Sequence, residues 1–288
     1  MHIIDTHIHI WDVEKISYPW LEGAPALLNR TYTLEELNGS KKPKASWAGV
    51  LVQASNNRED TVWMLKVASQ QDWIEGVVGW LPLMEPEKVA TELESSYAKQ
   101  SLLKGVRHLI HDEIDPEWLL QEKVIESLKL IEKQGLSYDF VGVNAAHLKT
   151  ALKLSEKIPG LKMIFDHCNQ PPNPNTQEFA LWSDLMKQAS GNKNFYAKIS
   201  GLGTATGKGE AWGAEDIVHG VGKVLEYFGE DRCMCGGDWP VSLLAGSYQH
   251  TWGNYLSVFD QLISDETVLQ KILAKNAMNF YNLKNIQS

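Results

Sequence analysis

The sequence is poor in cysteine and in positive charge, and it has no long apolar run. Three cysteines among 288 residues are too few, and odd in number, for a disulfide framework, which favours a reducing compartment. The net charge of −9 argues against a nucleic-acid-binding protein and against docking on anionic membranes. No uncharged apolar stretch reaches about 18 residues, and the N-terminus lacks the basic and apolar regions of a signal peptide. We therefore expect a globular protein of the cytoplasm.

Two further signals are missing, and both bear on domain organisation. No Gly/Ser-rich or Pro-rich linker divides the chain, so residues 1–288 are expected to form a single domain. No Gly-x-Gly-x-x-Gly follows the first predicted strand, which disfavours a dinucleotide-binding fold. Hydrophobic residues make up 43% of the chain, enough for a large core without covalent staples.

Short apolar runs alternate with longer amphipathic segments along the whole chain. The runs are nearly continuous in apolar residues, which is typical of strands buried on both faces of a parallel sheet. Eight strand–helix units favour a (β/α)8 TIM barrel, with an open doubly wound sheet as the alternative. The eight predicted strands are Ile3–Ile10, Ala48–Ser55, Val77–Leu83, Leu103–Ile110, Ser137–Gly142, Lys162–Asn169, Phe195–Leu202 and Arg232–Pro240.

The amphipathic segments predict the helices of the barrel. Asn57 is a plausible cap for the first of them, and the segment Trp11–Trp47 is expected to loop over the barrel mouth. One or two short helices are expected in the tail, Asp265–Leu283. The other predicted helices cover Asn57–Gln70, Pro86–Lys99, Pro116–Lys133, Asn144–Lys157, Thr176–Ser190, Ala214–Phe228 and Ser247–Ser264.

Two histidines close the first predicted strand. Simple alternation places Ile3, Asp5, His7 and His9 on one face, with the two imidazoles about 7 Å apart along the strand. In a barrel that face is the interior, and the strand end lies at the mouth, where catalytic residues gather. Such a pair can bind one metal ion through neutral ring nitrogens, and Asp5 could orient them from behind.

Two more candidate ligands lie at other strand ends. Alternation with Phe165 directs His167 inward at the end of the sixth strand, and alternation with Met234 directs Asp238 inward at the end of the eighth. A closed barrel pairs the eighth strand with the first, so Asp238 is expected beside His7 and His9. Three histidines and one carboxylate are a credible set for a single metal ion with room for a water.

Two basic residues are predicted to face the barrel interior. Arg107 is expected either to contact a substrate carbonyl or carboxylate, or to form an internal ion pair. Lys198 is expected either to contact the substrate or to pair with Asp238 or another carboxylate. The sequence leaves both choices open.

Aromatic residues near the strand ends are candidates for substrate contact. Trp11 and Trp239 lie in mouth segments, where an indole face could stack on a sugar, although tryptophan also fills large cores. Tyr138 begins the fifth strand and could reach the substrate. Histidines without a partner pattern, His111 among them, are expected on the surface or in loops.

As a set, these motifs resemble the amidohydrolase superfamily over essentially the whole chain. The similarity is to its amidohydrolase-2 type branch, which includes L-fuconolactone and L-rhamnonolactone hydrolases and pyrone-dicarboxylate lactonase. The motifs are His7-x-His9 with Trp11-Asp12, Lys104-Gly105-Val106-Arg107-His108, Asp166-His167, Lys198-Ile199-Ser200-Gly201-Leu202 and Gly237-Asp238-Trp239-Pro240-Val241.

The resemblance implies a TIM barrel that opens a sugar-derived lactone by attack of water on the ring ester. It implies that His7, His9, His167 and Asp238 frame the site, and that one divalent metal ion, zinc first among them, is bound there. A metal-free mechanism is the alternative within the same branch. We assign Asp238 as general base and Arg107 and His167 as stabilisers of the oxyanion.

Two other functions stay open at this point. Decarboxylating relatives on the same scaffold act on aromatic or muconate-type acids, and carbon dioxide release would distinguish them. A barrel that binds a ligand or metal without catalysis is the third hypothesis. The expected partner is a small-molecule lactone, and the oligomeric state is open, a homo-oligomer included.

Overall fold

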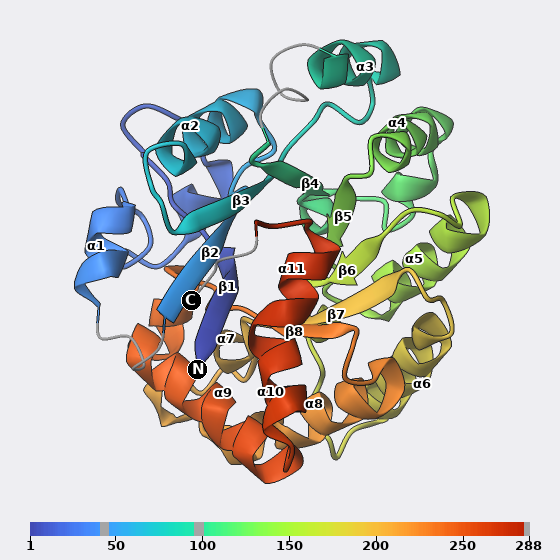
Figure 1. Cartoon of the computed structure of the whole chain (residues 1–288). Helices are drawn as coiled ribbons and strands as arrows, with labels where there is room; N and C mark the ends of the chain where they lie inside the picture. Colours follow the sequence, from blue (N-terminus) through green and yellow to red (C-terminus); the bar gives the residue numbers. More distant parts are fainter. Residues whose placement is uncertain (41–45, 95–100, 285–288) are drawn as a thin grey trace.

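Eight parallel strands form one sheet whose order follows the chain (Figure 1). The sheet closes where the segment after β8 meets the end of β1: His9 N donates to Trp239 O at 2.7 Å, and Asp238 N donates to His7 O at 2.8 Å. The predicted TIM barrel is confirmed. The strands are β1 (His2–Ile8), β2 (Ser46–Val52), β3 (Ile74–Gly79), β4 (Leu103–His108), β5 (Ser137–Phe140), β6 (Met163–Phe165), β7 (Phe195–Ile199) and β8 (Cys233–Cys235).

Helices surround the strands in the computed structural model, which describes residues 1–40, 46–94 and 101–284 (Figure 1). Several begin at a side chain that accepts a backbone N–H three residues further on, as Asn57 does from Asp60, which confirms the predicted cap. The helices are α1 (Leu34–Gly39), α2 (Arg58–Ala68), α3 (Pro86–Glu94), α4 (Glu122–Lys133), α5 (Ala145–Lys157), α6 (Gln177–Ser190), α7 (Leu202–Ala205), α8 (Ala214–Phe228), α9 (Tyr248–Leu262), α10 (Glu266–Gln270) and α11 (Asn276–Phe280).

Apolar side chains fill the barrel interior near the N-terminal ends of the strands, and the C-terminal helix α11 covers that end of the barrel. Ala277 and Phe280 of α11 and Tyr281 after it belong to the same buried cluster as these strand residues. Figure 1 shows α11 crossing in front of the strands at the end where the N-terminus lies. An open site is therefore expected at the opposite end of the barrel, where the strands end. The strand residues of this cluster are Ile4, Ala48, Val50, Val52, Val78, Ile164 and Met234.

Several strands end earlier than their apolar runs predict. β6 stops at Phe165, because the backbone from His167 to Gln170 turns into the left-handed region. β8 stops at Cys235, before Gly236 and Gly237. Most of the residues that follow these two points stay buried at the barrel mouth, although they lie outside the hydrogen-bonded strands.

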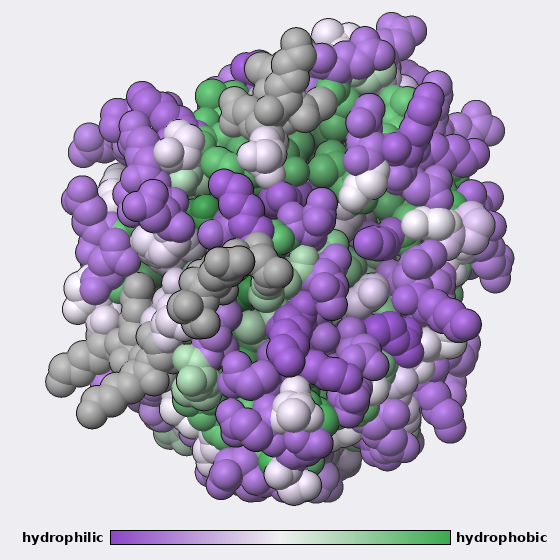
Figure 2. All heavy atoms as spheres, in the orientation of Figure 1, coloured by the Kyte–Doolittle hydropathy of each residue, from purple (hydrophilic) through white to green (hydrophobic). Residues whose placement is uncertain are grey.

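The third strand is also misplaced, because β3 spans Ile74–Gly79 and not Val77–Leu83, and the other differences concern helices. The predicted helix Pro86–Lys99 is α3 as far as Glu94, and residues 95–99 lie outside the described part of the chain. The tail forms the two short helices α10 and α11, as predicted, joined by a π-helical turn at Lys271–Lys275. Hydrophilic residues dominate the face shown in Figure 2. No helix within the described ranges is long and apolar enough to cross a membrane.

Candidate active site

A β-bulge at the end of β1 directs two histidines into the barrel. Ile4 belongs to the interior cluster, and β1 has one residue more than β2 between Asp5 and Ile8. This extra residue reverses the alternation, so His7 and His9 face the interior while Asp5 faces the surrounding helices. The prediction that Asp5 shares the face of the histidines is therefore wrong, and the inward direction of His7 and His9 depends on a bulge that simple alternation misses.

The carboxylate of Asp5 holds the bulge in place from outside the barrel. Its Oδ1 accepts the backbone N–H of His7 at 3.0 Å and that of Gly237 at 2.8 Å, and its Oδ2 accepts the hydroxyl of Tyr248 at 2.5 Å. Asp5 thereby ties the end of β1 to the segment that carries Asp238. Burial raises the pKa of Asp5 to about 6, although all three donors act in the opposite direction.

His167 reaches the site from a left-handed turn after β6. Ile164 points into the barrel, so strand alternation directs Asp166, and not Phe165 or His167, inward. At His167 the backbone has φ 56°, and its ring Nδ1 lies 2.9 Å from the hydroxyl of Ser200. The alternation predicted for His167 is wrong, but the turn brings its ring to the site.

These side chains and Asp238 form one cluster, called here the mouth cluster: His7, His9, His167 and Asp238. The Nε2 atoms of His7 and His9 are 3.1 Å apart, and they lie 3.6 and 3.4 Å from Oδ1 of Asp238. His7, His167 and Asp238 each offer a ligand atom, and these atoms lie within 4.8 Å of one another. The structure therefore brings together all four residues that the sequence singled out.

The charges of the mouth cluster suit a site that takes up protons or binds a cation. Burial lowers the pKa of His7 and of His9, so these imidazoles are neutral with lone pairs available. Burial would raise the pKa of Asp238, but His167 and His9 outweigh it and hold the pKa at about 2. An ionised carboxylate thus faces neutral imidazoles.

A cavity of about 370 Å³ opens beside the mouth cluster. One part of its wall is polar and includes His9, His167 and Asp238 of the cluster, and another part is apolar. Its volume suits a single sugar-sized ring. The residues that line it are His9, Trp20, Ala54, Arg107, Leu109, His111, Val141, Val143, His167, Gln170, Gly201, Thr204, Ala205, Asp238 and Val241.

The two predicted basic residues have different surroundings. Arg107 lines the cavity and also pairs with Asp166, whose Oδ2 is 3.1 Å from its Nη1, so both of its predicted roles fit its position. Lys198 is fully buried, does not line the cavity, and pairs with Asp139 at 2.6 Å and Asp166 at 2.9 Å. Its position favours the ion-pair alternative over substrate contact.

The predicted aromatic contacts lie behind the cavity wall. Trp11 and Trp239 are buried, and Trp11 packs edge-on against Trp20, which does line the cavity. Tyr138 lies opposite Val106 on the outer face of the sheet and is fully buried. None of these three borders the cavity, so direct substrate contact stays a prediction that their positions do not favour.

Sequence reasoning missed four polar or aromatic residues that line the cavity: Trp20, His111, Gln170 and Thr204. His111 lies in a short helical turn directly after β4, where it is exposed as predicted and also lines the cavity. The position of these residues after strand ends was the available signal. Asp166 belongs to the Asp166-His167 motif, but the sequence alone predicts no separate role for it.

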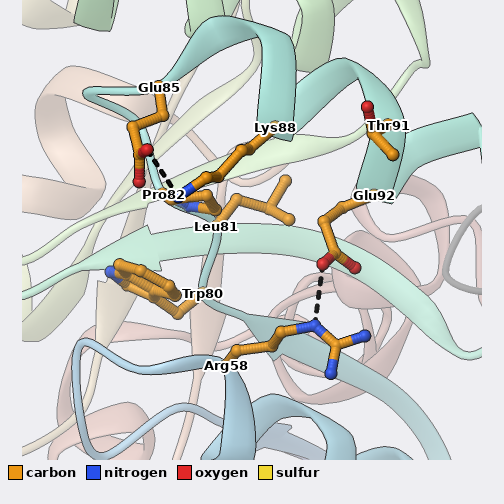
Figure 3. A pocket seen from close by; sticks show the side chains of 8 residues that line it. All are labelled: Arg58, Trp80, Leu81, Pro82, Glu85, Lys88, Thr91 and Glu92. Atoms are coloured by element: carbon orange, nitrogen blue, oxygen red, sulfur yellow. Dashed lines mark hydrogen bonds and ion pairs between the residues drawn. The ribbon is translucent and has the colours of Figure 1, made fainter.

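A second cavity, of about 300 Å³, lies between α2 and α3 outside the barrel (Figure 3). Its charged side chains pair with one another: Arg58 with Glu92 at 2.7 Å, and Lys88 with Glu85 at 2.6 Å. Among the residues that line it, no histidine or cysteine is present. The mouth cavity is therefore the better candidate for chemistry.

The comparisons with known proteins agree with this geometry. A family model described as "Amidohydrolase" matches residues 4–283. The chain belongs to the amidohydrolase family. It is 26% identical to an L-fucono-1,5-lactonase of Burkholderia ambifaria, over 97% of this chain and 95% of that protein. It is also 26% identical to an L-rhamnono-gamma-lactonase of Scheffersomyces stipitis, over 63% of this chain and 60% of that one.

Solved structures match the whole barrel. An amidohydrolase of Burkholderia multivorans with bound zinc superposes with a TM-score of 0.89, at 25% identity, and the match covers 99% of this chain and 100% of that one. The family membership makes this amidohydrolase chain a hydrolase.

Proposed function

We propose that this chain hydrolyses a sugar-derived lactone at the mouth cluster. The observation that carries the proposal is the Asp238 carboxylate, whose Oδ1 lies 3.4 Å from Nε2 of His9, at the wall of a cavity sized for one ring. The two lactonases that resemble the chain support the choice of a lactone as substrate.

In the proposed reaction a water attacks the carbonyl carbon of the ring ester while Asp238 takes its proton. The negative charge that forms on the carbonyl oxygen needs donors, and the guanidinium of Arg107, which lines the cavity, is the first candidate. His167 lies on the same wall and is the second candidate donor. Asp238 then returns the proton to the alkoxide that leaves, and the product is a hydroxy acid.

The mouth cluster also fits a divalent metal ion. His7, His167 and Asp238 each offer a donor atom of the kind that zinc takes, and these atoms lie within 4.8 Å of one another, while Nε2 of His9 lies 3.1 Å from Nε2 of His7 and 3.4 Å from Oδ1 of Asp238. His7, His167 and Asp238 would hold the ion, with His9 beside them. A bound ion would supply Lewis acidity, polarising the carbonyl and making the water easier to deprotonate. This help matters because a carboxylate with a pKa of about 2 is a weak base.

The charges around the cavity favour a neutral lactone over a dicarboxylate. Arg107 is the single lysine or arginine among its described lining residues, and Asp166 already neutralises much of its charge. Two carboxylates in such a site would meet Asp238 without compensating cations. We therefore propose an uncharged aldonolactone as the substrate class.

A hydrolysis screen with a pH indicator tests this proposal. Purified protein is given neutral aldonolactones of five- and six-membered rings and, separately, an anionic pyrone-dicarboxylate, before and after treatment with a chelator. We expect proton release with neutral lactones, stopped by the chelator and restored by zinc. Release that the chelator leaves unchanged would favour the metal-free mechanism, and release of carbon dioxide from aromatic acids instead would contradict lactone hydrolysis.

A further inference from the structure

A larger cavity adjoins the mouth cavity at Ala205. It has a volume of about 530 Å³ and is called here the side groove. One wall is the segment between β6 and α6, another is α7 with the residues directly after it, and the third is the start of α8. Its lining includes Pro171, Asn175, Phe179, Thr206, Lys208 and Glu215. The reaction proposed above takes place in the mouth cavity and makes no use of this second space.

Two segments of the chain run from the mouth cavity into the side groove. In the first, His167 and Gln170 line the cavity, and the residues that follow, 171–175, line the groove. In the second, Gly201 lines the cavity, and Ala205 lines both spaces. The two segments meet at the mouth, where a Cβ on Gly201 would lie 2.5 Å from Nδ1 of His167. Because both segments border the two spaces in the same order, the side groove continues the mouth cavity.

The boundary between the two spaces is low at Ala205. Successive residues of an α-helix lie about 100° apart around its axis, so Ala205 lies between Thr204, which lines the cavity, and Thr206, which lines the groove. The side chain of Ala205 is a single methyl group, and this residue is exposed. A substituent on a ring bound in the mouth cavity can therefore pass over α7 into the side groove.

Gln170 offers a neutral polar group at the same boundary. It is the last of four consecutive residues in the left-handed region, with φ 49°, and the next residue, Pro171, already lines the groove. The side chain of Gln170 is half-buried, and its amide has no hydrogen-bond partner among the described residues. An amide both donates and accepts hydrogen bonds, so it suits a hydroxyl group or an ether oxygen at this point.

The lining of the side groove suits a neutral sugar. Lys208 pairs with Asp216, which leaves the Glu215 carboxylate as the unbalanced charge, so a carboxylate or phosphate substituent would be repelled. Phe179 and the prolines between residues 171 and 174 offer apolar faces to the C–H surface of a sugar. The exposed amide of Asn175 is available to sugar hydroxyls.

We propose that the side groove binds a second sugar, so that the substrate is an aldonolactone with a further sugar attached to it. The lactone ring lies in the mouth cavity, the glycosidic link passes over Ala205 beside Gln170, and the second sugar lies against Phe179 and Asn175. This inference rests on the proposed lactone hydrolysis and adds to it the size of the substrate.

Kinetics with matched lactones test the proposal. The probes are six-membered gluconolactone and galactonolactone, each alone and with a second hexose at O4 or O6, and hydrolysis is measured above the spontaneous rate. We expect kcat/KM for at least one two-sugar lactone to exceed that of its bare lactone about tenfold, mainly through a lower KM. Bare lactones that are hydrolysed as well as every two-sugar lactone, or better, would overturn this inference and leave lactone hydrolysis standing. Hydrolysis of none of these lactones would contradict the proposed function and this inference with it.

Variants of the groove locate the effect. Phe179→Ala and Asn175→Ala should each lower kcat/KM for the two-sugar lactone about fivefold relative to the bare lactone. Ala205→Trp places a large ring on the boundary and should remove the advantage of the two-sugar lactone. Leu181→Ala is the control, because Leu181 belongs to the same helix as Phe179 but is exposed and lies outside the groove lining. It should leave both values of kcat/KM unchanged. A preference for two-sugar lactones that survives in all three groove variants would contradict binding in the side groove.

Discussion

Two groups of buried charged side chains share this barrel, and their surroundings differ. The mouth cluster contains one ionised carboxylate among histidines and borders a cavity. The second group, called here the buried ion-pair chain, consists of Arg107, Asp166, Lys198, Asp139 and Tyr281. In it two cations face two carboxylates, and of these five residues Arg107 alone lines the cavity. The comparison teaches that paired charges enclosed by the barrel stabilise the fold, while a carboxylate that faces imidazoles beside a cavity is placed for chemistry.

The largest effect is expected at the mouth cluster. Asp238→Asn keeps the shape of the side chain but removes the base, so turnover of a lactone should fall about 10²–10⁴-fold while the circular dichroism spectrum stays unchanged. Asp12→Asn is a matched control, because Asp12 also follows β1 but pairs with the exposed Lys15. Turnover near the unmutated value in Asp238→Asn would remove Asp238 from its assigned role.

Removing a cation from the buried ion-pair chain should lower the stability of the folded protein. Lys198→Met leaves two buried carboxylates without their shared cation, which should lower the free energy of unfolding by about 3–5 kcal/mol in urea titrations. Lys271→Met removes a lysine that also pairs with two carboxylates, Glu230 and Asp231, but at the surface. It should change little. Equal losses of unfolding free energy in the two variants would show that burial does not make the ion pairs of Lys198 more important for stability than those of Lys271.

Alanine substitutions at two glycines can distinguish the effect of backbone strain from damage to the site. Gly201 and Gly207 have positive φ angles of 60° and 68°, so alanine is strained at both. Only at Gly201 would the new Cβ lie 2.5 Å from Nδ1 of His167, whereas nothing lies within 4 Å at Gly207. Both alanine variants should be destabilised, but kcat/KM should fall about 10²-fold only in Gly201→Ala. Similar kinetics in both would place His167 outside the reaction.

The smallest effect concerns a buried carboxylate that bonds only to neutral donors. Burial raises the pKa of Asp60 from 3.8 to about 6, although the Ala54 N–H and the Tyr18 hydroxyl act in the opposite direction. Between these pH values the unfolded chain has released a proton that the folded protein keeps, so the free energy of unfolding should fall as pH rises, by at most about 1.4 kcal/mol per pH unit. Urea titrations from pH 4 to 7 should show this slope flattened in Asp60→Asn. An identical slope in both proteins would assign it to other groups.

The fold was predictable because its signals are repeated along the chain. Eight apolar runs separated by amphipathic segments indicate a barrel even when single boundaries are misplaced, as at β6 and β8. The closure between residues 7–9 and 238–239 was predicted from the barrel itself. Repetition makes such a prediction tolerant of local error.

The details of the site were less predictable, because they depend on backbone irregularities. A bulge after Asp5 and left-handed turns at His167 and Asp238 decide where those side chains point, and none of the three has a simple sequence signature. The roles of Lys198 and Asp166 depend on which side chains face them across the barrel, which only the closed structure reveals.

The central claim is that the mouth cluster directs water onto the carbonyl carbon of a lactone. Hydrolysis in water enriched in 18O, followed by mass spectrometry of the hydroxy acid under single-turnover conditions, tests it most directly. The account predicts one 18O atom in the carboxylate and none in the released hydroxyl group. A product that carries the label on the hydroxyl group, or that has lost carbon dioxide, would contradict it.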